Sequence, residues 1–104
     1  MPKQRLETSR VDVEFRKGAA RLTARRYQLR DEHSGSFTLT GRPSADVRLE
    51  MSDSMVTAVL MLADDTVRHR WHGPLPKEVG GRRQLALIDG TDGGGWTCTI
   101  TRHD

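Results

Sequence analysis

The stretch ADVRLEM, residues 45–51, decides the fold class, because its apolar and charged residues alternate without interruption. Successive side chains of a β-strand point to opposite faces, so this alternation is typical of a strand with one dry face and one wet face. The odd-numbered positions of the segment are the apolar ones. We therefore predict a strand that places Leu49 in the core.

The same alternation recurs on both sides of this segment. It predicts strands over about 10–17, 20–31, 36–40, 45–51, 66–72, 83–89 and 96–102. Short strands separated by Gly, Pro, Asp and Ser are typical of antiparallel all-β domains. We expect one domain over residues 1–104, built as an antiparallel sandwich or a small barrel of seven to eight strands with at most one short helix. Leu39 joins Leu49 in the predicted core.

Residues 55–63 allow two interpretations, because they are apolar on both parities. As a strand, the segment would be central in its sheet and covered on both faces. As a helix, it would gather Met55, Ala58, Val59 and Leu62 on one side. The β-branched residues of this stretch favour the strand.

The predicted strand over 20–31 changes phase part-way along. Ala20, Leu22 and Ala24 are even-numbered, whereas Tyr27 and Leu29 are odd-numbered. A slip of one residue moves every later side chain to the opposite face. A β-bulge at Arg25-Arg26 would restore a single inward face, because a bulge inserts one extra residue into a strand. Two short strands around a kink are the alternative.

Turn-forming residues separate the predicted strands. We expect a turn over residues 31–35, a break over 41–44, a tight turn at Asp64-Asp65, a strand end over 73–76, a loop or single helical turn over 77–81 and a glycine-rich loop over 89–95.

The formal net charge of +3 is unevenly distributed. Between Arg10 and Arg30 seven basic residues accompany two acidic ones, a local charge of +5. The first ten residues contain no apolar core of a secretory signal, and no apolar run approaches the length of a membrane span, so we expect a cytoplasmic protein without membrane contact.

No catalytic or metal motif is present. Cys98 is the only cysteine, and its alternation with Trp96 and Ile100 predicts a buried structural thiol. His69 and His72 would point to opposite faces of a strand, and so could not share a metal ion. Asp89 and Asp92 lack the spacing of a calcium-binding loop. We therefore predict no catalytic residue, no metal and no cofactor, and a protein that is not an enzyme.

Arginines at outward positions are the remaining candidates for function. Arginine is suited to contacts with phosphates and carboxylates. The aromatic side chains take inward phases, whereas proteins that bind single-stranded nucleic acids use exposed aromatics for base stacking. The candidate contacts to a protein or nucleic-acid partner are Arg16, Arg21, Arg25, Arg26, Arg30, Arg68 and Arg70.

Three functions are compatible with these features. The first is a non-enzymatic binding or assembly module that contacts another protein through a sheet face or edge strands, as a homo-oligomer or as a subunit of a larger assembly. The second is a basic β-domain that binds nucleic acid. The third is a small barrel that holds an apolar ligand against Met51, Met55 and Met61.

Overall fold

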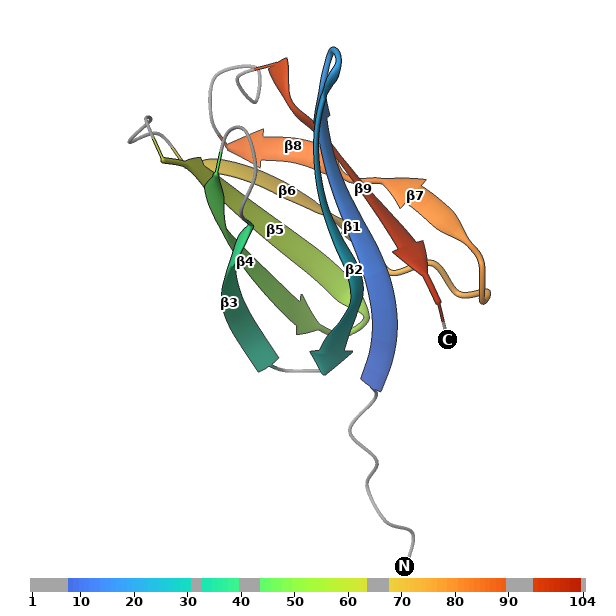
Figure 1. The fold of residues 1–104 in the computed structure, drawn as a ribbon. Helices are drawn as coiled ribbons and strands as arrows, with labels where there is room; N and C mark the ends of the chain where they lie inside the picture. The colour runs from blue at the N-terminus through green and yellow to red at the C-terminus, as the bar shows by residue number, and fades with distance from the viewer. Residues whose placement is uncertain (1–7, 31–32, 40–43, 64–67, 90–94, 104) are drawn as a thin grey trace, which may run out of the picture.

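The computed structural model describes residues 8–30, 33–39, 44–63, 68–89 and 95–103 (Figure 1). These residues form nine strands and no helix, which confirms the all-β prediction. The strands are β1 (Thr8–Lys17), β2 (Ala20–Arg30), β3 (His33–Leu39), β4 (Ala45–Ser52), β5 (Met55–Leu62), β6 (His69–Pro74), β7 (Arg82–Gln84), β8 (Ala86–Asp89) and β9 (Thr97–Arg102).

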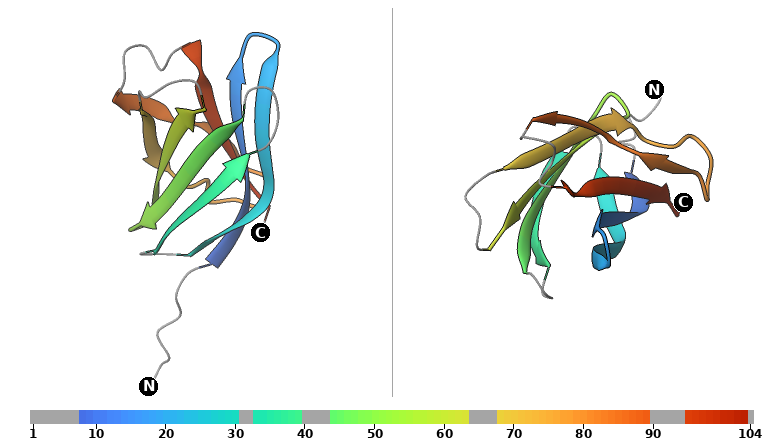
Figure 2. Two further views of the ribbon diagram at one scale, coloured as in Figure 1. Left: turned by 60° about the vertical axis from the view of Figure 1, so that its left-hand side comes forward. Right: turned by 90° about the horizontal axis from the view of Figure 1, so that it is seen from above.

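The nine strands form two antiparallel sheets that pack face to face as a sandwich rather than a closed barrel (Figure 2). Sheet A has four strands in the order β2-β1-β9-β7, and sheet B has five in the order β3-β4-β5-β6-β8. Within sheet A, β1 pairs with both β2 and β9, so segments from the two ends of the sequence lie side by side.

The core lies between the sheets and is built from the inward positions that the alternation predicts. Val11, Val13 and Phe15 of β1 are fully buried, as are Leu49 of β4 and Ile100 of β9. The ring centroids of Phe15 and Trp71 lie 5.5 Å apart, so the two sheets meet through this aromatic pair. The predicted core position of Leu49 is thus confirmed, whereas the side chain of Leu39 lies outside the described residues.

The predicted bulge at Arg25-Arg26 is present. Val11 pairs with Tyr27 and Val13 pairs with Ala24, so two residues of β2 oppose the single residue Asp12 of β1. Arg26 adopts a left-handed backbone conformation with φ 54°. The bulge restores one inward face, because Leu22 before it and Leu29 after it are both buried.

Residues 55–62 form a strand, not a helix, and β5 is the central strand of sheet B. Val56, Ala58 and Leu60 point into the core. The expectation that both faces would be covered is wrong for the described residues. Val59 and Met61 on the opposite face are only partly buried and line a surface groove.

The strand predicted over 83–89 divides in two. Arg82–Gln84 pairs with β9 in sheet A, and Ala86–Asp89 pairs with β6 in sheet B. The chain crosses between the sheets at Leu85, whose side chain is buried and whose N–H donates to the carbonyl of Cys98 at 2.8 Å. The alternation of apolar residues cannot reveal this crossing. The inward side chains of both sheets point into the same core, so the apolar residues keep one parity across it.

Two other predicted boundaries shift. The turn predicted over 31–35 is wrong at residues 33–35, because β3 begins at His33, and residues 31 and 32 lie outside the described residues. Gly35 belongs to β3, pairs with Leu49 of β4 and lies beneath the side chain of Tyr27. Strand β6 runs on to Pro74 instead of ending at residue 72, and residues 77–81 form a loop.

The turn predicted at Asp64-Asp65 and most of the break over 41–44 and of the glycine-rich loop lie outside the described residues. Asp92, one of the two aspartates considered as calcium ligands, also lies there.

Candidate binding faces

The outer face of sheet A gathers most of the predicted contact residues. Strand pairing fixes this placement, because residues directly opposite one another share a face. Arg16 pairs with Arg21 and with Thr97, and Glu14 pairs with Thr23 and Thr99. We call this surface the basic face; its charged members are Arg10, Arg16, Arg21, Arg25, Arg26, Arg30, Arg82, Asp12 and Glu14.

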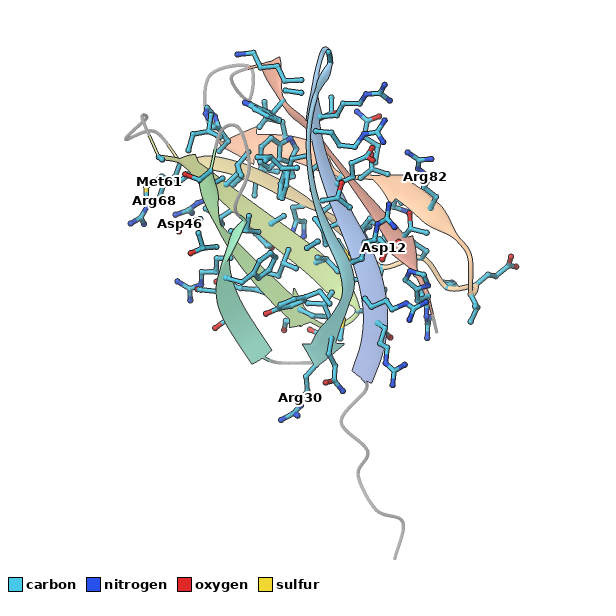
Figure 3. The ribbon with its side chains drawn as sticks, in the orientation of Figure 1. Asp12, Arg30, Asp46, Met61, Arg68 and Arg82 are labelled. Carbon is cyan, nitrogen blue, oxygen red and sulfur yellow. The ribbon has the colours of Figure 1, made fainter. Side chains whose placement is uncertain are left out.

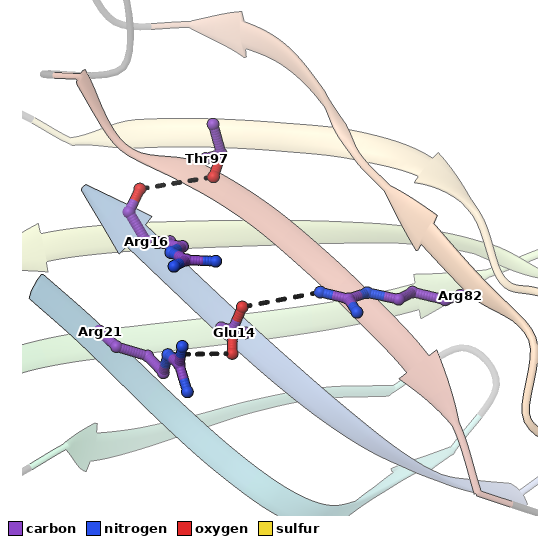
Figure 4. A network of polar contacts seen from close by, with 5 residues as sticks. All are labelled: Glu14, Arg16, Arg21, Arg82 and Thr97. Carbon is purple, nitrogen blue, oxygen red and sulfur yellow. Dashed lines mark hydrogen bonds and ion pairs between the residues drawn. The ribbon is translucent and has the colours of Figure 1, made fainter. Parts of the chain in front are cut away.

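Glu14 lies at the centre of a polar network on this face (Figure 4). Its carboxylate lies 3.4 Å from Arg21 Nε and 3.8 Å from Arg82 Nη2, and Thr97 donates a hydrogen bond to the carbonyl of Arg16. Both arginine side chains are more than half exposed, so these ion pairs add little stability. The two ion pairs link side chains from three strands, β1, β2 and β7.

Asp12, the second carboxylate of the basic face, holds the bulge. Its Oδ1 accepts the backbone N–H of Arg26 at 2.9 Å and Nε2–H of His103 at 2.8 Å. Partial burial acts to raise the pKa of Asp12, but the Arg26 N–H, the His103 hydrogen bond and the charges of His103 and Arg25 together lower it. Asp12 is therefore an occupied acceptor that stays ionised at neutral pH.

The positive charge of the molecule is concentrated on the basic face. Seven arginines and two carboxylates give this face a formal charge of +5. The whole chain carries +3, with 17 basic and 14 acidic residues, so the other ten basic and twelve acidic residues sum to −2. The remainder of the chain is thus slightly acidic.

Arg68 and Arg70 do not join the other five predicted contact residues. Both line a groove on the outer face of sheet B, on the opposite side of the sandwich from the basic face. In Figure 3, Arg68 lies beside Asp46 and Met61 at the left, whereas Asp12 and Arg82 lie at the right. Alternation predicts correctly that Arg70 points outward, but it does not say from which sheet.

The groove on sheet B has a volume of about 330 Å³ and runs across strands β3 to β6. Its floor carries the apolar side chains of Val59 and Met61, and its rim is charged. Arg48 and Glu50 form an ion pair at 3.1 Å, and Asp46 Oδ1 accepts the hydroxyl of Thr38 at 2.9 Å. The remaining charged rim residues are Arg68 and Arg70.

Sequence reasoning did not identify this groove. The available signal was the apolar character of Val59 and Met61 on the parity that is polar in neighbouring strands. Arg82 was missed as a member of the basic face because its strand was predicted without knowledge of its partner.

The three methionines considered for an apolar ligand lie apart. Met51 is buried in the core, Met55 lines a second cavity beside Pro74 and Leu75, and Met61 lines the groove. They line no common cavity within the described part of the chain.

The remaining reactive side chains considered above, Cys98, His69 and His72, lie within the packed sheets. Cys98 is fully buried and its thiol is free, and burial raises the pKa of that thiol. His69 is buried against Trp71, whereas His72 lies on the other face and shares a hydrogen bond of 2.8 Å with Thr57 Oγ1. Among the described residues, no cluster of His, Cys, Asp and Glu could hold a metal ion.

Comparison with protein-family models, with curated proteins and with solved structures finds no match to this chain. Within the described residues, no helix has the length and hydropathy needed to cross a membrane.

Proposed function

We propose that the chain is a non-enzymatic binding module that holds a segment of another protein in the groove on sheet B. The observation that carries this proposal is an apolar floor inside a charged rim. Protein interfaces are commonly built with a less polar centre and a polar, hydrated margin. Val59 and Met61 supply the centre, and the charged side chains of β4 and β6 supply the margin.

The charges of the rim favour a partner segment with an acidic side chain. Of its two carboxylates, Glu50 is paired with Arg48 and Asp46 accepts from Thr38. Three arginines against two engaged carboxylates leave the rim slightly positive. A complementary segment would insert one apolar side chain onto Val59 and Met61 and place an acidic side chain beside it, near Arg68.

Selection from a random peptide library displayed on phage tests this partner chemistry. We expect enrichment of peptides that carry an acidic residue next to a large apolar one. The variant Val59→Thr/Met61→Gln removes the apolar floor with little change in shape, and should weaken binding of a selected peptide at least about tenfold.

The matched control is Val79→Thr, which makes an exposed apolar side chain polar in the loop over 77–81, outside the lining of the groove. It should bind the peptide as the unmodified chain does. Selected peptides without an acidic residue, or equal loss in both variants, would overturn the proposal. Sedimentation velocity tests whether a second copy of the chain occupies the groove instead. Self-association that disappears in Val59→Thr/Met61→Gln would assign the groove to that second copy and overturn the proposal.

A further inference from the structure

The outer face of sheet A has a composition unlike that of the groove. The outward positions of its described residues are arginines, threonines and glutamines, and the only carboxylates among them are Asp12 and Glu14. Val59 and Met61 of the groove have no counterpart among these outward positions. A charged surface of this kind recognises charge, not apolar side chains.

Both carboxylates of the face are already engaged within it. Asp12 accepts from Arg26 and His103, and Glu14 lies between Arg21 and Arg82. No carboxylate among the described residues forms an ion pair with Arg16, Arg26 or Arg30. The bulge brings the arginines before and after it to the same side, because Arg21 and Arg30 would otherwise point to opposite faces.

We propose that the basic face binds the phosphate backbone of double-stranded nucleic acid. Arginine guanidinium groups bind phosphate oxygens strongly, and hydroxyl and amide side chains such as Thr23, Thr97 and Gln28 are common secondary phosphate donors. This binding is independent of the groove on sheet B, which lies on the other side of the sandwich.

The buried aromatic residues favour a duplex over a single strand. Binders of single strands stack bases on exposed aromatic rings. Phe15, Trp71 and Trp96 are buried, and Tyr27 and Phe37 are partly buried against each other with ring centroids 4.5 Å apart. A surface of arginines without stacking rings binds the duplex backbone without reading its sequence.

Fluorescence anisotropy with a labelled DNA duplex of mixed sequence, about 20 base pairs long, tests the proposal. If Arg16, Arg21, Arg25, Arg26 and Arg30 each contact one phosphate, log affinity against log salt should have a slope of about −4 to −5. Arg16→Glu/Arg30→Glu should lower the magnitude of that slope by about 2 and weaken binding similarly for duplexes of unrelated sequence.

The matched control is Lys77→Glu/Arg83→Glu, which makes the same change in net charge at exposed positions outside the basic face. It should retain the slope of the unmodified chain. Circular dichroism checks that both variants remain folded. An equal loss of affinity in the two variants would overturn the proposal, because it would show that binding depends only on the net charge of the chain.

Two competitor arms separate the other polyanions. Polyglutamate and a single-stranded oligonucleotide of the same length are added to the preformed duplex complex. We expect the duplex to be displaced by neither at equal charge concentration. Displacement by polyglutamate would assign the face to an acidic protein, displacement by the single strand would remove the preference for a duplex, and absence of duplex binding at low salt would end the proposal altogether.

Discussion

The phenol group of Tyr27 lies directly over Gly35 and leaves no room for a side chain at that position. Tyr27 belongs to β2 at the edge of sheet A, and Gly35 belongs to β3 at the edge of sheet B. The contact therefore joins the two sheets at the corner of the sandwich, and the Tyr27 ring also packs on Phe37.

Gly35→Ala should lower the free energy of unfolding by about 1–3 kcal/mol, because the new methyl group overlaps the Tyr27 hydroxyl. Tyr27→Phe removes that hydroxyl and keeps the ring. In the Tyr27→Phe background, Gly35→Ala should cost at least about 0.5 kcal/mol less. Urea unfolding of the four proteins of this cycle measures the coupling, and strictly additive effects would contradict the contact.

Leu49→Ala should destabilise the protein by about 2–5 kcal/mol, because the side chain is fully buried between the sheets. Leu87→Ala is the matched control. Leu87 is 38% exposed on the short strand β8, so we expect a much smaller loss, near the ~0.5 kcal/mol of surface substitutions. Comparable losses in chemical denaturation would show that the two positions are equally buried.

Arg26→Gly should leave the stability unchanged or raise it by up to about 1 kcal/mol. Arg26 has a positive φ, which is unfavourable for residues with a Cβ and natural for glycine. Gln28→Gly, at an extended position of the same strand, should instead lower stability by about 0.5–1 kcal/mol. Thermal unfolding measures whether each substitution raises or lowers stability. A loss of stability of similar size in both variants would argue against backbone strain at Arg26.

Asp12→Asn should lower stability at neutral pH by about 1 kcal/mol, because it keeps an oxygen for the Arg26 N–H but loses the charge. The folded pKa of Asp12 is lowered from 3.8, so the unfolded state takes up the proton first as the pH falls. The advantage of the unmodified chain over Asp12→Asn should therefore be complete above about pH 5 and shrink below pH 3.8. Denaturation at a series of pH values measures it; a constant difference down to about pH 2 would contradict the ionised contact.

The bulge was predictable because the apolar residues of β2 change parity along the strand. Leu22 and Leu29 differ in parity, and only an extra residue between them lets both face the core. The strand over 55–62 was predictable for a different reason, because its β-branched residues favour a strand over a helix. Both signals are local in the sequence.

What the sequence could not predict depends on partners distant in the chain. Gly35 reads as a turn residue until Tyr27 is seen to cover it. Leu85 and Leu87 share a parity, so nothing local shows that the chain changes sheets between Gln84 and Ala86. For the same reason, alternation placed Arg30 and Arg70 outward but could not assign them to opposite sides of the molecule.

The crossing at Leu85 has a consequence for how the molecule opens. A single residue separates a strand of sheet A from a strand of sheet B, and its backbone is hydrogen-bonded to Cys98. Because only Leu85 separates β7 from β8, neither sheet can separate from the core without displacing the first strand residues of the other sheet. Local opening of the two sheets is thereby coupled, and amide hydrogens at the centres of β1 and β5 should exchange through one shared, cooperative event.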